Sequence, residues 1–171
     1  MSSSKQLTEF YTPMLTYLQV SKALSRELLL NKPKDFNLLC YLLDKNYKFD
    51  GGKVVVISDK EKQLIKEVIT ISDEISEILV NKGGLVEDTR LTINYEPNPE
   101  ITDIKLDDDN KDIGLNGLLL VHYKIIKSAE KEEISGNIEY YKQFIFPREI
   151  VTVIKENYHK LKDELESITL V

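Results

Sequence analysis

One histidine stands out as a residue that could do chemistry, because it lies in an apolar stretch of the chain. His122 falls at helical spacing with Leu119 and Ile126, so we expect its ring to point into the core, more than three-quarters buried. A buried histidine can act as a general base, bind a metal, or serve a structural role with a ring nitrogen hydrogen-bonded. Its stretch offers no second histidine or acidic residue at ligand spacing, which favours the structural role. Its neighbour Tyr123 is a second candidate polar residue of the core.

An acidic run at residues 107–112 has the type of ligand that Ca²⁺ prefers, but not the spacing. An EF-hand loop that starts at Asp108 has Ile113 where glycine is required and Leu119 where glutamate is required. The glycine pairs at 51–52 and 83–84 lack the flanking residues of a phosphate-binding loop. We therefore predict no metal and no cofactor, and we expect residues 94–112 to form a mobile acidic loop.

Aromatic residues are dense at two places in a chain that has no tryptophan. Packing in the core is the favoured interpretation, because aromatic rings bury large areas. A surface for a partner protein is the alternative, since exposed tyrosine-rich patches often mark interfaces. The candidate interaction aromatics are Phe10, Tyr11, Tyr17, Tyr140 and Tyr141.

The charge balance and the absence of targeting signals narrow the setting. With 23 Lys and Arg against 29 Asp and Glu, the net charge is −6 and no basic stripe is present, so we predict no nucleic-acid binding. The apolar runs are far shorter than the roughly 20 residues that span a bilayer, so we predict no membrane span. The N-terminus does not resemble a signal peptide, and the single cysteine, Cys40, lies in an apolar segment typical of a buried, inert thiol. We predict a cytoplasmic protein.

Hydrophobic periodicity predicts five helices, one of them short. The best marked begins after Ser58, which forms a capping-box pair with Glu61, and it stops at Gly83. In the first helix, Pro13 either kinks a longer helix or starts a shorter one that Thr12 caps. The predicted helices cover residues 7–30, 35–45 with Asp35 as cap, 59–81, 116–127 and 148–168.

Three segments do not have a helical pattern: 47–57, 90–112 and 138–146. Asp50-Gly51-Gly52 within the first is a hairpin signal, and the others contain alternating or aromatic residues that suit short strands or ordered loops. We therefore predict a mainly α fold, a compact antiparallel helical bundle with possible short edge strands, in one domain over residues 1–171. The alternative is an α+β fold in which these segments form a small sheet.

Scattered short motifs carry a resemblance. They are Phe10 to Leu15 (FYTPML), Val121-His122-Tyr123, and Phe146-Pro147 before the last helix. Together they resemble a loose set of small, uncharacterised bacterial helical proteins with a Phe-Tyr-x-Pro-Leu-type segment and a mid-chain His-Tyr helix. This chain departs from them in having Met14 for the usual leucine. The resemblance implies a helical bundle and no particular activity.

Two classes of function stay open. The first is a non-enzymatic interaction protein that binds another protein, such as an adaptor, an inhibitor, or a bacterial immunity or defence component. The second is a helical-bundle enzyme or metalloprotein that uses His122 with acidic residues from other helices. The helix over residues 59–81 has two adjacent apolar rows, and this apparent surplus predicts a weak preference for a homodimer.

Overall fold

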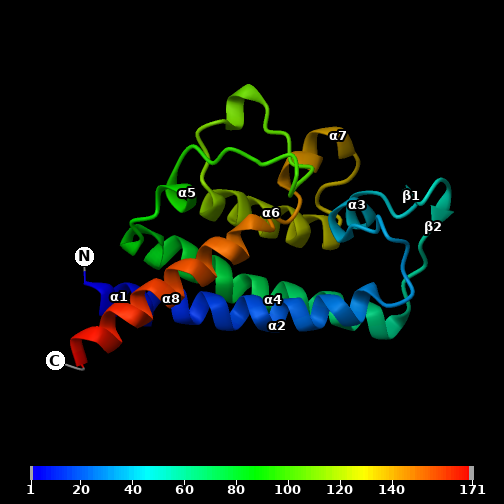
Figure 1. Cartoon of the computed structure of the whole chain (residues 1–171). Coiled ribbons are helices and arrows are strands. Elements are labelled where there is room, and N and C mark those ends of the chain that lie inside the picture. Colours follow the sequence, from blue (N-terminus) through cyan, green and yellow to red (C-terminus); the bar gives the residue numbers. More distant parts are fainter. Residues whose placement is uncertain (1, 170–171) are drawn as a thin grey trace.

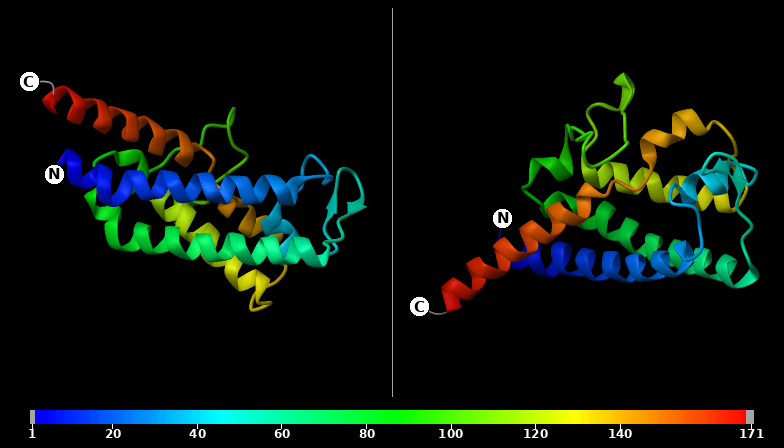
Figure 2. Two further views of the ribbon diagram at one scale, coloured as in Figure 1. Left: turned by 90° about the horizontal axis from the view of Figure 1, so that it is seen from below. Right: turned by 45° about the vertical axis from the view of Figure 1, so that its right-hand side comes forward.

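Four long helices form the framework of the molecule. The computed structural model describes residues 2–169, and 66 % of it is helical. The long helices are α2 (Thr12–Leu29), α4 (Asp59–Lys82), α6 (Leu115–Glu130) and α8 (Glu149–Thr169). Figures 1 and 2 show α2 antiparallel to α4, α6 packed on α4, and α8 crossing the N-terminal part of the first helix. These features confirm the predicted mainly α bundle with short edge strands.

A small hairpin and several short helices join the long ones. Strands β1 (Lys48–Phe49) and β2 (Lys53–Val54) pair antiparallel, and the turn at Asp50-Gly51-Gly52 has positive φ at all three residues. The hairpin signal is therefore confirmed. The short helices are α1 (Ser3–Gln6), η1 (Leu7–Tyr11), α3 (Leu38–Leu43), η2 (Gly83–Leu85), α5 (Thr89–Thr92), η3 (Asp108–Asn110), α7 (Ile138–Tyr141) and η4 (Lys142–Phe144).

The first helix runs through Pro13 without starting there. It begins at Ser3, and α1, η1 and α2 follow one another with no break. The segment before the proline is a π-helical turn, in which the Thr12 N–H donates to the Leu7 carbonyl five residues back. The wider turn accommodates the proline, which lacks an N–H and would clash with the carbonyl four residues back in a regular α-helix. The hypothesis that Thr12 caps a helix starting at Pro13 is wrong.

Helix α4 forms the centre of the core, as its periodicity predicts. Both hydrogen bonds of the capping box between Ser58 and Glu61 are present. Its apolar rows are covered within the chain by α2 on one side and α6 on the other, with Ile75 fully buried. The apolar surplus on which the predicted dimer rested is therefore largely used inside one chain.

Two of the three segments without a helical pattern contain helical turns. Within 90–112, residues up to Thr92 belong to α5, which Asp88 caps and which turns Leu91 fully into the core. The segment 138–146 forms α7 and η4. Short strands and ordered loops were both left open for these stretches. The helical turns were not foreseen, because such short turns show no complete helical period and depend on caps and burial. Helix α3 is likewise capped by Asn37, and Asp35 instead accepts from the Asp50 N–H at 3.0 Å.

The acidic loop is attached to the body of the protein. Tyr95, Thr102 and Ile104 are buried. The Tyr95 hydroxyl donates to Glu149, and Gln143 accepts from the Asp107 N–H at 3.2 Å. The carboxylates of the run remain on the outside, but a loop that is free along its whole length does not fit these contacts.

The start of α6 passes so close to α5 that only glycine fits between them. A Cβ atom on Gly114 would lie 2.5 Å from the Leu91 carbonyl oxygen and 2.6 Å from the Ile93 backbone nitrogen. Beside this contact, Ile93 and Ile113 pair in an isolated antiparallel β-bridge. The acidic loop therefore begins and ends at a backbone-to-backbone contact.

Replacing Gly114 by alanine tests this contact. We expect Gly114→Ala to lower the free energy of unfolding by about 3 kcal/mol, because backbone atoms must move to admit the methyl group. Gly84→Ala is the matched control, since a Cβ at Gly84 meets nothing within 4 Å. Chemical denaturation of both variants measures the difference, and equal stabilities would contradict the close approach.

Candidate functional site

His122 is buried on α6, as its spacing predicts. The residue is only 6 % exposed, and its Nδ1 donates to the Phe144 carbonyl oxygen at 2.8 Å. The rings of Tyr123 and Phe146 lie 5.4 and 5.7 Å away, centroid to centroid. Burial lowers the pKa of His122 to about 4, so the ring is neutral near pH 7. The predicted burial and ring hydrogen bond are confirmed.

The surroundings of His122 suit a structural link. The structure brings it a carbonyl and two aromatic rings, and the carbonyl fastens α6 to the segment that follows η4. Within residues 2–169, no three His, Cys, Asp or Glu side chains gather as a group able to hold a metal ion. Nothing in this arrangement adds support to the enzyme or metalloprotein hypothesis.

The predicted interaction aromatics separate into core and surface residues. Phe10 and Tyr11 are fully buried and pack edge to face, so they cannot form a contact surface in the folded chain. Tyr17 is half-buried. Tyr140 is exposed and Tyr141 half-buried, with ring centroids 5.2 Å apart beside a shallow groove of about 310 Å³ over α6. Tyr140 and Tyr141 therefore remain the better candidates for contact with a partner.

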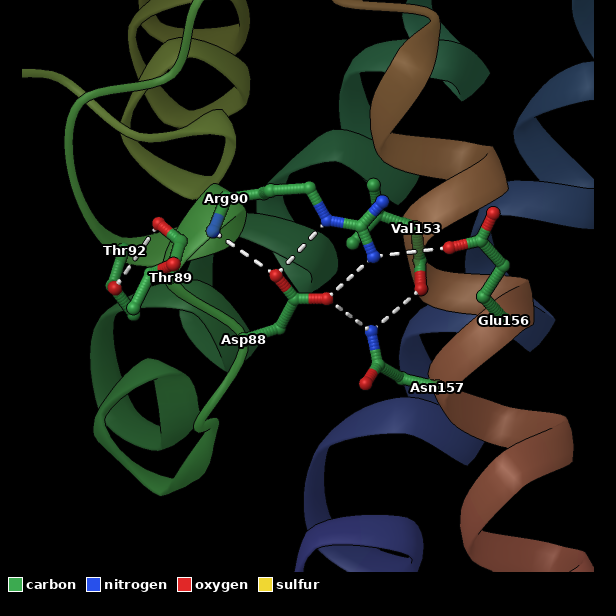
Figure 3. A network of polar contacts seen from close by, with 7 residues as sticks. All are labelled: Asp88, Thr89, Arg90, Thr92, Val153, Glu156 and Asn157. Carbon is green, nitrogen blue, oxygen red and sulfur yellow. Dashed lines mark hydrogen bonds and ion pairs between the residues drawn. The ribbon is translucent and has the colours of Figure 1, made fainter.

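A polar network at the other end of the bundle ties α5 to α8 (Figure 3). The Asp88 carboxylate caps α5 and accepts from the backbone N–H, Nε and Nη2 of Arg90, the last at 2.7 Å. It also accepts from Asn157 Nδ2 at 2.9 Å, while Arg90 reaches Glu156 on α8. Arg90 first and Asn157 next lower the pKa of Asp88 to about 2. With four donors already bound, this carboxylate serves the fold and has little capacity for a ligand.

The Tyr11 hydroxyl lies near this network and is enclosed in the core. It has no hydrogen-bond partner among the described residues, and burial, with smaller contributions from Asp88 and Glu87, raises its pKa. The ring therefore remains a neutral phenol. Its position explains why Tyr11 behaves as a core residue.

A groove of about 670 Å³ lies at the hairpin end of the molecule. We call it the hairpin groove: it runs between the loop 30–33 after α2, the chain leaving β2, and the first turns of α4. Lys32 and Glu61 form an ion pair in its wall, and Lys32 with the Ser58 N–H lowers the pKa of Glu61. Leu30 is exposed at its rim.

The end of β2 and the chain that follows it expose apolar side chains. We call residues 54–57 the hairpin edge. Val54 and Val56 are exposed, Val56 by 86 %, whereas Val55 and Ile57 are buried, which is the alternation of an extended chain. The backbone of Val56 and Ile57 makes no hydrogen bond with another described residue. Figure 1 shows this stretch running from β2 to α4 at the margin of the molecule.

Sequence reasoning found the hairpin and missed the edge beside it. The run Lys53-Val54-Val55-Val56-Ile57 was visible as a strand signal, but a strand signal does not say whether a neighbouring strand exists. Only the tertiary structure shows that the other elements lie away from this run. Uncharged, branched residues in an unpaired extended stretch are the signal that could have been sought.

Comparisons of the chain with protein-family models, with curated proteins and with solved structures found no match. None of the described helices is both long and apolar enough to cross a bilayer.

Burial of a neutral His122 makes stability depend on pH. The unfolded state takes up a proton near the ordinary pKa of 6.5, whereas the folded state does so only near 4. The free energy of unfolding should therefore fall as pH drops from 6.5 to 4, by about 3 kcal/mol from this residue. Denaturation across this range should show a flatter pH dependence in His122→Gln than in His159→Gln, whose side chain is exposed. Equal pH profiles would contradict the assignment.

The network in Figure 3 makes a second prediction. Asn157→Asp keeps the shape of the side chain but sets a carboxylate against Asp88 and against the Val153 carbonyl, two contacts of 2.9 Å. We expect a loss of about 2 kcal/mol in the free energy of unfolding. Glu156→Gln, which changes an exposed contact of Arg90, should cost less than about 1 kcal/mol. Thermal unfolding of the two variants measures both losses of stability, and a larger loss in Glu156→Gln than in Asn157→Asp would overturn this account.

Proposed function

We propose that this protein is a non-enzymatic interaction protein that binds an extended segment of a protein along the hairpin edge. The observation that carries the proposal is that the backbone of Val56 and Ile57 makes no hydrogen bond with another described residue. This stretch lies beside the hairpin groove and carries the exposed side chains of Val54 and Val56. An adaptor, an inhibitor or a bacterial immunity component would each act through such a surface. We also propose a cytoplasmic setting, supported by a single, buried cysteine at Cys40.

Strand addition is the binding mode that these features suit. An extended segment laid beside a strand exchanges main-chain hydrogen bonds with it, and alternate side chains provide specificity. Proteins commonly protect exposed edges with charges or proline. The hairpin edge has neither within its four residues, and charged side chains come only before and after it, at Lys53 and Asp59.

The edge also indicates the chemistry of the bound segment. Val54 and Val56 present a narrow apolar row on one side, and Leu30 continues apolar surface across the hairpin groove. A segment with apolar side chains at every second position would cover this row while its backbone exchanges hydrogen bonds with Val56, since only alternate residues of a strand bond to one neighbouring strand. Proline at the pairing positions would prevent binding, since it lacks the N–H donor.

A peptide-display selection on the purified protein tests this function. We expect the selection to enrich peptides with apolar residues at alternate positions, and Val56→Asp to weaken their binding at least about tenfold, because it places a charge on the docking face. The exposed position of Val56 means that this variant should keep its melting temperature.

Val80→Asp is the matched control for the selection. Val80 is also an exposed valine, at 67 %, but it lies near the opposite end of α4. Peptides that bind the hairpin edge should bind this variant as they bind the unchanged protein. Equal binding to Val56→Asp and the unchanged protein, or an equal loss in both variants, would refute the proposed site.

A further inference from the structure

We infer that the segment which pairs with the hairpin edge is the same edge of a second copy of this chain. The two copies meet antiparallel across a two-fold axis that passes through Val56. This inference rests on the proposed function, because both use the unpaired backbone at Val56. The order of exposed, buried and charged residues along the edge is what indicates a second copy of this chain as the bound segment.

The exposure pattern restricts how two copies can pair. A two-fold axis perpendicular to the sheet leaves each face of the joined sheet on the same side, so exposed side chains must lie opposite exposed ones. With Val56 on the axis, Val56 meets its own copy, Val54 lies opposite Ser58, and Val55 lies opposite Ile57. Exposed residues are then matched with exposed ones, and buried with buried. A shift by one residue would set exposed Val54 against buried Ile57.

The charges favour the same pairing over the one with Val55 on the axis. With Val56 on the axis, Lys53 comes next to Asp59, the first residue of α4, and the symmetry repeats this pair of opposite charges at the other end. With Val55 on the axis, Lys53 would lie opposite Ile57 and Asp59 opposite Gly51, so neither charge would find its complement. The edge is therefore complementary to itself in one register, with a lysine before it and an aspartate after it.

Both charged groups can exchange their present contacts. Lys53 bonds Asp50 at 3.1 Å with both side chains more than half exposed, and Asp59 contacts Lys62 at 3.8 Å. Such exposed pairs hold their partners weakly. Only alternate residues of a strand bond to one neighbouring strand, so pairing between copies would let Val56 exchange with its own copy the main-chain hydrogen bonds that a single chain leaves unmade. The short edge makes a small interface, so the dimer should be concentration-dependent.

Charge exchange tests the register. In Lys53→Asp, two aspartates face each other at both ends of the interface, and in Asp59→Lys, two lysines do. Each variant alone should dissociate about tenfold more readily than the unchanged chain, as two attractive pairs become repulsive. An equal mixture of the two variants should associate again, because each aspartate of the first variant then faces a lysine of the second at both ends of the interface.

Light scattering from micromolar to millimolar concentration measures the result. The unchanged chain should rise from 19.7 kDa toward twice that mass, the single variants should stay near 19.7 kDa, and the mixture should rise. A misfolded variant would not regain association on mixing, so the mixture also controls for folding. Circular dichroism of each variant checks its helix content.

The results that would overturn the dimer differ from the results that would overturn the proposed function. A mass of 19.7 kDa for the unchanged chain throughout would overturn the dimer, while Val56-dependent binding of selected peptides would leave the proposed function standing. Association that is unaffected by either charge change, or that the mixture does not restore, would overturn this pairing. Association that survives Val56→Asp, together with no selected peptide, would overturn both.

Discussion

The wide apolar arc of α4 is the constraint on which the rest of the bundle depends. A helix with two adjacent apolar rows cannot be satisfied by one neighbour, and here α2 and α6 cover it from two sides. The N-terminal helix supplies α2 as one unbroken rod because a π-helical turn admits Pro13. Helix α8 then closes the N-terminal end. The hairpin is left beyond the far ends of α2 and α4, where none of the described long helices lies over its edge.

Polar groups hold the smaller elements in place around this core. Asp88 joins α5 to α8, His122 joins α6 to the chain after η4, and Gln143 holds the acidic loop at Asp107. Each group is largely satisfied by its protein partners, so these clusters stabilise the fold and offer little to a ligand. His122, the residue that first suggests catalysis, is thus a link between two elements.

The hairpin edge differs from these clusters because the backbone of Val56 and Ile57 makes no hydrogen bond with another described residue. Unpaired backbone beside exposed valines favours association with another extended chain, and charges at both ends restrict the register of that association. The rigid capping box behind it, between Ser58 and Glu61, sets where the extended stretch ends and α4 begins.

The sequence by itself determined what local patterns can encode. The bounds of α4 follow from its capping box, its periodicity and Gly83, and the burial of His122 follows from its place on the apolar face of α6. The turn at Asp50-Gly51-Gly52 follows from residues that accept positive φ.

The tertiary structure alone decided the contacts between residues distant in the chain. The helical state of α5, α7 and η4 depends on caps and burial that no single period shows. The close approach at Gly114 and the Asp88–Asn157 bond join segments whose spacing in sequence contains no signal. Val56 is likewise exposed only because the packing of the chain leaves its side chain uncovered. A side chain's pattern states the face it prefers, but only the packed chain determines whether anything covers that face.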